Sequence, residues 1–168
     1  LVMLTLARTI EIRFSTWDEF DLESEKPLWR IPADRMKMDR DHMIPLSRQA
    51  VGVLIELKRF VREDQYVFEQ HKNPKKPMSE NTMLYALYRM GYRGKATVHG
   101  FRATVSTILN ENKFRGDVIE LLLAHVEKNK VRAAYNRAEY LDERREILQW
   151  WADHLDELRL IEGKYVFA

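Results

Sequence analysis

The chain has 168 residues, of which 45% are apolar and 32% charged, with a net charge of +2 and no cysteine. This length and composition allow one domain with a sizeable core. The lack of cysteine excludes disulfides and thiolate metal sites. The sequence contains no run of 18 apolar residues, so it predicts no membrane-spanning helix.

The first third of the chain predicts a helix followed by a small sheet. Residues 1–14 are apolar at helical spacing and predict one continuous helix. Short apolar runs with prolines at their edges follow, and they predict an antiparallel sheet of about three strands. These runs are Phe20–Leu22, Leu28–Ile31 and Met43–Leu46.

The rest of the chain is mostly helical by pattern, so the predicted fold class is α+β, with helices around a small antiparallel sheet. Ser47 is placed to cap the first of these helices. Residues 66–68 predict a short extended piece and residues 71–77 a loop. Further helices are expected to begin at Ser79, at Val98 and after Gly116, and to span Leu141–Leu160.

The last helix carries an apolar stripe at heptad-like spacing, formed by Leu141, Leu148, Trp151, Leu155 and Leu158. Such a stripe has to be buried against another surface. The sequence leaves two partners open, the helix's own domain and a neighbouring protomer.

Charge is unevenly distributed along the chain. Residues 89–102 and 128–137 each hold four Lys or Arg and no acid, whereas residues 139–162 hold eight acids. Basic segments of this kind favour a phosphate-rich partner, although a solvated surface gives the same pattern. The candidate DNA-binding residues are Lys72, Lys75, Lys76, Arg93, Lys95, Lys128, Lys130 and Arg132.

Several residues could carry chemistry, and each also has an ordinary structural explanation. Arg8 with Glu11 is consistent with a surface ion pair. His99 and Arg102 share a helix face by their spacing, and His125 follows Leu123-Ala124. The remaining candidates are Lys37, in Arg35-Met36-Lys37-Met38, and Tyr135, ten residues after His125.

In this order, the residues resemble the catalytic domain of the tyrosine recombinases, or phage integrases, and most of all those of prophages and satellite phages. The resemblance covers residues 1 to about 158. It implies that Arg8 and Arg102 are the catalytic arginines and Tyr135 the nucleophile. It also implies catalytic roles for Lys37, His99 and His125. The function implied is site-specific cutting and rejoining of DNA through a 3′-phosphotyrosine intermediate, in integration or excision of mobile DNA.

Physical chemistry is consistent with these implied roles. Two guanidiniums hold the non-bridging oxygens of a phosphodiester through charge-assisted hydrogen bonds. His99 orients the phenol or accepts its proton, and Lys37 protonates the departing 5′ oxygen. No metal or cofactor is expected. The expected partners are attachment-site DNA and further copies of the full-length protein in a tetramer, in the bacterial cytoplasm at the nucleoid and not at a membrane.

The sequence departs from the family pattern at a few positions. Family members commonly carry glycine where Leu6 and Ala124 stand, and Pro-Gly or a similar pair at Thr9-Ile10. A missing glycine matters where the backbone needs a positive φ. The family's separate N-terminal DNA-clamping domain is not recognised in these residues, so residues 1–168 are interpreted as the catalytic domain alone.

The sequence leaves alternatives for the nucleophile and for the function. Tyr140 competes with Tyr135 as the nucleophile, but it lies beside Glu139 and Asp142, which raise the pKa of a phenol. The competing functions are a topoisomerase-like nicking and resealing enzyme, a DNA-binding module with a damaged site, and a helical interaction protein. A covalent adduct with DNA separates the first of these from the other two.

Overall fold

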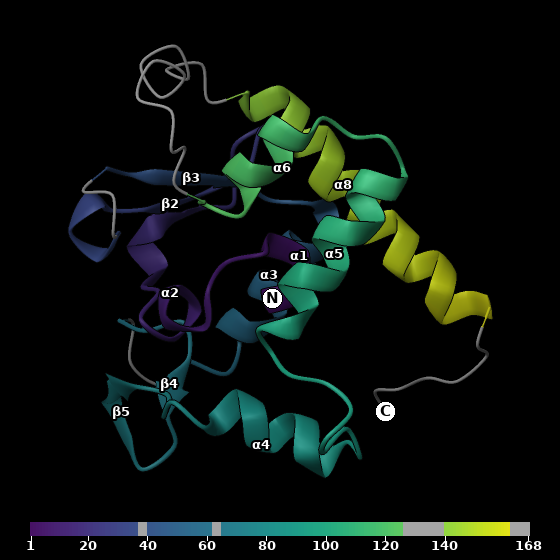
Figure 1. Ribbon diagram of the computed structural model, residues 1–168. Helices are drawn as coiled ribbons and strands as arrows, with labels where there is room; N and C mark the ends of the chain where they lie inside the picture. The colour runs from purple at the N-terminus through teal and green to yellow at the C-terminus, as the bar shows by residue number, and fades with distance from the viewer. Residues whose placement is uncertain (37–39, 62–64, 126–139, 162–168) are drawn as a thin grey trace.

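The computed structural model describes residues 1–36, 40–61, 65–125 and 140–161 (Figure 1). The predicted α+β class is confirmed, because helices surround a small antiparallel sheet. The sheet and α2 lie on one side of the view, with α5, α6 and α8 on the other. None of the described helices is long and apolar enough to cross a membrane.

The N-terminal segment forms two short helices, so the prediction of one helix over residues 1–14 was wrong. α1 covers Val2–Thr5 and α2 covers Thr9–Arg13. Leu6 ends α1 in the left-handed conformation, with φ 56° and ψ 14°. The side chains of Leu6 and Ala7 are fully buried. Tertiary burial at this point therefore overrides the local helical pattern.

The predicted three-stranded sheet is present with antiparallel order β1-β2-β3. The strands are β1 (Phe20–Asp21), β2 (Leu28–Ile31) and β3 (His42–Pro45). Trp29 pairs with Ile44, and both are fully buried together with Ile31. The alternation of buried and exposed residues along β2 fits a strand with one face on the core.

The segment after the sheet contains one helix and a hairpin. α3 (Arg48–Lys58) starts where predicted, because the Ser47 side chain accepts a hydrogen bond from the Ala50 amide at 3.3 Å. β4 (Glu69–Gln70) and β5 (Asn73–Pro77) form a two-stranded antiparallel sheet. The loop prediction for residues 71–77 was therefore wrong over most of that range.

The next described helices after the hairpin are α4, α5 and α6. α4 (Thr82–Arg89) lies with β4 and β5 at one end of the molecule (Figure 1). α5 (Gly100–Glu111) and α6 (Gly116–Leu122) match the predicted helices. Their inward side chains belong to the same hydrophobic core as the sheet, and these are Val105, Leu109, Val118, Ile119 and Leu122.

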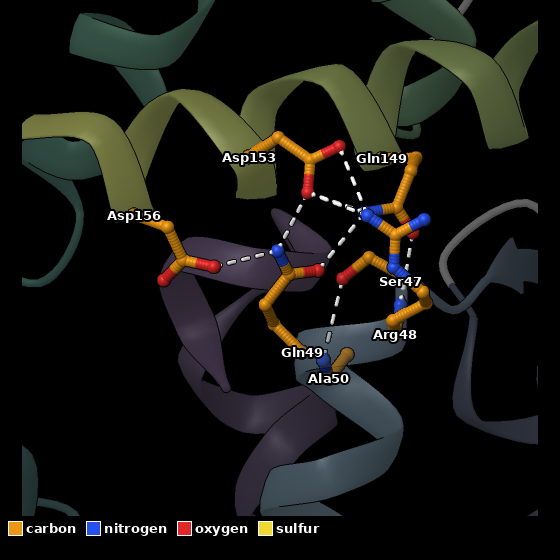
Figure 2. Close-up of polar contacts among 7 residues, drawn as sticks. All are labelled: Ser47, Arg48, Gln49, Ala50, Gln149, Asp153 and Asp156. Atoms are coloured by element: carbon orange, nitrogen blue, oxygen red, sulfur yellow. Dashed lines mark hydrogen bonds and ion pairs between the residues drawn. The ribbon is translucent and has the colours of Figure 1, made fainter.

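The last helix, α8 (Leu141–Ile161), packs within its own chain over its first three turns. Leu148 and Trp151 are buried in the main core, and the Trp151 indole N–H donates to the Met3 carbonyl at 2.8 Å. Figure 2 shows the polar contacts that fasten α8 to the start of α3. They include Arg48 to Asp153 at 3.0 Å and Gln49 to Asp156 at 2.8 Å. Leu158 and Leu160, further along, are exposed, and docking of this end on another protomer stays a prediction.

Candidate active site

The break between α1 and α2 is what places Arg8. Leu6, in its left-handed conformation, turns the chain, and Arg8 becomes the residue that precedes α2 in an extended conformation. The carbonyl of Leu6 accepts a hydrogen bond from Nη1 of Arg102. The same turn therefore supplies one arginine and a backbone acceptor for the other.

Arg8 is held by three hydrogen bonds. Its Nη1 donates to Glu11 Oε1 at 2.7 Å, and its backbone amide donates to Glu11 Oε2 at 2.6 Å. Its Nη2 donates to the carbonyl of Ala124 at 2.8 Å. The side chain keeps 34% of its surface exposed, so the guanidinium is fixed in direction but still accessible.

Glu11 holds Arg8 in the structure, and the sequence did not single it out as a site residue. The ion pair with Arg8 that the spacing indicated is present, but Glu11 is only 4% exposed, so the pair is not a surface pair. A buried carboxylate that pairs with both the backbone and the side chain of Arg8 fixes the guanidinium strongly. The three-residue spacing was visible in the sequence, but the burial was not.

Arg102 lies in the first turn of α5 and is 6% exposed. Its Nη2 donates to the carbonyl of Leu123 at 2.6 Å, and its Nη1 donates to the carbonyl of Leu6. Burial lowers the pKa of the Arg102 guanidinium, and the neighbouring positive charge of Arg8 lowers it further. The structure brings these two cations into one region, because they donate to the consecutive carbonyls of Leu123 and Ala124.

The turn that ends α6 joins the two arginines. Leu123 and Ala124 offer consecutive carbonyls, one to each guanidinium, and Ala124 has a positive φ of 49°. His125 comes next in the chain, and its Nδ1 lies 2.7 Å from Oε2 of Glu120. Arg8, Arg102 and His125 are therefore gathered around one turn.

His99 is exposed and immediately precedes α5, three residues before Arg102. Lys37 and Tyr135 lie outside the described residues, so their roles stay predictions. Among the residues that the structure describes, no group of three or more His, Cys, Asp or Glu is placed to hold a metal ion.

Two polar groups that the sequence did not single out are the half-buried His42 and the buried Arg144. Burial and the charges of Arg144, Arg8 and Arg102, with a smaller contribution from Arg40, lower the pKa of His42 to about 3. Arg144 itself is 2% exposed and donates from Nη2 to the carbonyl of Met43 in β3. The sequence held one signal, since Arg144 falls on the apolar heptad stripe of α8, three residues after Leu141.

Five of the eight candidate DNA-binding residues lie in the part of the chain that the structure describes. Lys72, Lys75 and Lys76 are exposed on or beside the β4–β5 hairpin. Arg93 and Lys95 are exposed between α4 and α5, where the Arg93 guanidinium lies 5.4 Å from the ring centre of Tyr88. The others, Lys128, Lys130 and Arg132, lie outside the described residues.

The fold and the site define an α+β protein in which two arginines from separate elements form a cationic site suited to an anionic group. The sequence profile of the phage integrase family matches residues 1–141. The chain therefore belongs to the phage integrase family.

Curated relatives agree with this assignment. The chain is 42% identical over 172 residues to the prophage integrase IntA of Escherichia coli (strain K12), covering 95% of this chain and 41% of that protein. It is 44% identical over 182 residues to the integrase of Enterobacteria phage P4, covering 99% and 40%. It is 41% identical over 154 residues to the integrase of Shigella phage Sf6, covering 91% and 40%.

The chain thus spans about two fifths of the length of these relatives. No solved structure matched the chain.

Proposed function

We propose that this protein is a site-specific DNA recombinase that cuts and rejoins DNA through a 3′-phosphotyrosine intermediate, in integration or excision of mobile DNA. One observation carries the proposal. Arg8 and Arg102 donate to the consecutive carbonyls of Ala124 and Leu123, next to His125, in a chain of the phage integrase family.

The two guanidiniums suit the charge that develops when a phosphodiester is attacked. Each guanidinium carries five N–H donors, and the described contacts of each use two. The remaining donors can bind the non-bridging oxygens as negative charge grows on them. Donors held in place before the reaction need no reorganisation, and removing one such donor commonly costs about 100-fold to 1,000-fold in rate.

In the proposed reaction, the phenol oxygen of Tyr135 attacks phosphorus while the bond to the 5′ oxygen breaks. His99 orients the phenol or accepts its proton, and Lys37 gives a proton to the departing 5′ oxygen. Rejoining is the reverse, with a 5′ hydroxyl attacking the phosphotyrosine bond. A tyrosine phenol has a pKa of about 10, so the nearby arginines favour reaction by stabilising its anion.

Tyr135 is preferred over Tyr140 as the nucleophile. The Arg115 guanidinium lies 4.7 Å from the ring centre of Tyr140, and Arg115 also pairs with Asp117 at 2.6 Å and Glu143 at 2.9 Å. Hydrogen bonds to Asp117 and Tyr140 raise the pKa of Arg115. Tyr140 is thus already engaged by Arg115 in a side-chain cluster, which favours Tyr135 as the nucleophile.

The proposed partners are double-stranded attachment-site DNA and three further copies of the full-length protein, assembled as a tetramer on that DNA. The exposed basic residues of the β4–β5 hairpin and the α4–α5 connection support DNA binding. Such a protein would act in the cytoplasm at the nucleoid. Sedimentation of the full-length protein with and without DNA measures the assembly.

The test of the proposal is formation of a covalent protein–DNA adduct on a nicked suicide substrate, followed on a denaturing gel. The full-length protein should form the adduct, and Tyr135→Phe should abolish it while DNA binding is retained. Tyr85→Phe serves as a matched control, because Tyr85 is 54% exposed and belongs to α4.

Other outcomes would change the assignment. An adduct that survives in Tyr135→Phe but is lost in Tyr140→Phe would move the nucleophile. No adduct with the unmodified full-length protein would favour a DNA-binding module. Adduct formation without exchange of strands between two duplexes would favour a topoisomerase-like enzyme. Cleavage should persist in EDTA, and its loss there would point to a metal-dependent nuclease.

A further inference from the structure

We propose that Glu120 is a positioning residue that fixes which ring nitrogen of His125 serves the reacting phosphate. The inference rests on the proposed function, because it concerns a histidine with a proposed role in strand cleavage. It assigns to Glu120 an effect on the rate of cleavage through His125 and no contact of its own with DNA.

The backbone at the end of α6 brings Glu120 and His125 together. Ala124 reverses the chain with its positive φ of 49°, and its amide donates to the carbonyl of Leu121 at 3.1 Å. The amide of His125 donates to the carbonyl of Glu120 at 3.0 Å. These two hydrogen bonds form the Schellman motif that closes many helices. In this motif the two residues joined by the outer hydrogen bond, here Glu120 and His125, commonly make a side-chain contact.

The side-chain contact between these two residues is polar. Nδ1 of His125 lies 2.7 Å from Oε2 of Glu120, and the two side chains are 50% and 57% exposed. A Schellman motif usually has a hydrophobic contact at this place. A carboxylate in the last turn of a helix is also unfavourable beside the negative end of the helix dipole. The stability of α6 therefore does not account for Glu120, whereas a role in holding the imidazole does.

A carboxylate at Nδ1 decides how the imidazole can be used. An ionised carboxylate only accepts hydrogen bonds, so Nδ1 of His125 carries the proton in this contact. The hydrogen bond at one ring nitrogen sets the proton position and the direction of the other. Nε2 takes part in none of the hydrogen bonds between described residues. The nitrogen that Glu120 leaves for the DNA is therefore Nε2.

The held imidazole lies beside the carbonyls that fix the two arginines. Leu123 accepts from Arg102 and Ala124 accepts from Arg8, and His125 is the next residue. The non-bridging oxygens of a phosphodiester are acceptors, so a ring that serves both Glu120 and the phosphate donates from both nitrogens. Donors that are oriented before the reaction act on the charge that develops there. Glu120 therefore prepares the ring for the same phosphate that the guanidiniums are suited to hold.

The first measurement reads the proton position directly. Long-range ¹⁵N–¹H spectra of the full-length protein, labelled with ¹⁵N-histidine, distinguish a proton on Nδ1 from one on Nε2. The signals of His125 are identified by their absence in His125→Ala. At pH 8, above the ordinary imidazole pKa of about 6.5, we expect Nδ1 to be protonated. In Glu120→Gln the amide can offer either its oxygen or its N–H, so both neutral forms of the ring should appear.

The second measurement is the single-turnover rate of adduct formation by the full-length protein on the nicked suicide substrate. Glu120→Gln should slow this rate by about 10-fold to 100-fold, the usual effect of removing a group that orients a functional histidine. Its affinity for DNA should not fall, because the substitution removes a negative charge. Its free energy of unfolding should not fall either, because the carboxylate lies in the last turn of α6.

Glu157→Gln is the matched control. Glu157 also faces a histidine, with its Oε2 4.0 Å from Nδ1 of His154, but this pair belongs to α8. The same chemical change should keep the cleavage rate within about threefold of that of the unmodified protein.

A double-substitution cycle tests whether Glu120 acts through His125. His125→Ala should slow adduct formation by about 100-fold. Adding Glu120→Gln to that variant should change the remaining rate by less than about twofold, since the group that Glu120 positions is already gone. A residue that acted on DNA directly would give the same slowing with and without His125.

The outcomes separate this inference from the proposed function. Equal slowing in both backgrounds, an unchanged rate in Glu120→Gln, or a ring of His125 with Nδ1 unprotonated would each overturn the role of Glu120. The adduct formed by the unmodified protein would still support the recombinase assignment in these three cases. No adduct with the unmodified protein would remove the proposed function, and the role of Glu120 would fall with it. Slowing that depends on His125, together with a proton on Nδ1, would support the inference.

Discussion

Arg8 and Arg102 bind neighbouring peptide carbonyls, those of Ala124 and Leu123, although 94 positions separate the two arginines in the sequence. The turn at the end of α6 thus acts as a shared acceptor that sets the spacing of two cations. Because like charges repel, such a pair requires fixed acceptors on the protein side. Any change to that turn should therefore affect both arginines together.

Arg102→Lys should slow adduct formation by about 100-fold, because an ammonium lacks the forked donors that serve both the carbonyls and a phosphate. It should also lower the free energy of unfolding by about 1–3 kcal/mol, since a buried carbonyl loses its donor. Single-turnover cleavage and urea unfolding measure the two effects. Arg48→Lys, at an exposed pair with Asp153, is the control. A rate equal to that of the unmodified protein would contradict the role of Arg102.

Ala124→Gly should raise the free energy of unfolding by about 1 kcal/mol, because alanine is strained at the positive φ of 49° and glycine is not. Ala103→Gly is the matched control. Ala103 is exposed inside α5, where glycine should instead destabilise by about 1 kcal/mol. Urea unfolding of both variants gives the comparison, and two changes of the same sign would refute the prediction.

His42 should make the protein less stable in mild acid. Burial and the charges of Arg144, Arg8, Arg102 and Arg40 lower its pKa from 6.5 to about 3 in the folded state. Between these values the unfolded chain binds a proton that the folded chain does not. Stability present above pH 6.5 is therefore lost as the pH falls.

The loss attributable to His42 from pH 6.5 to pH 5 should be roughly 2 kcal/mol. His42→Gln removes the titrating group, so its free energy of unfolding should fall less over the same range. Urea unfolding at both pH values, on both proteins, isolates the contribution of His42. Identical pH dependence would show that His42 titrates normally.

DNA binding should depend steeply on salt. If about five phosphates are contacted, the logarithm of the binding constant should fall with a slope near −4.5 against the logarithm of salt concentration. Replacing Lys75 and Lys76 with Gln should reduce the slope by about 1.8, or 0.9 for each contact removed. Fluorescence anisotropy of labelled DNA provides the measurement. Lys26→Gln, whose lysine pairs with Asp142, should leave the slope unchanged, and no effect of the double substitution would exclude the hairpin as DNA surface.

Because the first part of α8 packs within its own chain, truncating two leucines of its apolar stripe should change the free energy of unfolding by very different amounts. Leu148→Ala should cost about 2–5 kcal/mol of unfolding free energy, because Leu148 is fully buried in the main core. Leu158→Ala should cost under about 0.5 kcal/mol, because Leu158 is 43% exposed. Chemical unfolding of the monomer measures both, and equal costs would mean that the helix is packed differently in solution.

Local patterns in the sequence were sufficient for much of the fold. A short apolar run with prolines at its edges predicts β2, Ser47 begins α3, and the helices α5 and α6 follow from their apolar spacing. These features depend on residues a few positions apart, where backbone geometry and capping act. The ordered set of Arg8, Arg102 and His125 was also visible, because a motif is a property of order along the chain.

Contacts between distant segments decided the parts of the fold and of the candidate site that local patterns did not predict. The N-terminal helix breaks because burial of Leu6 and Ala7 outweighs local helical preference, and no neighbouring residue signals that break. The burial of Glu11 and Arg144 likewise depends on segments far away in sequence. The sequence by itself determined which charged groups the protein carries. Only the tertiary structure decided which carbonyls and carboxylates hold them, since hydrogen bonds between distant segments exist only once the core has brought those segments together.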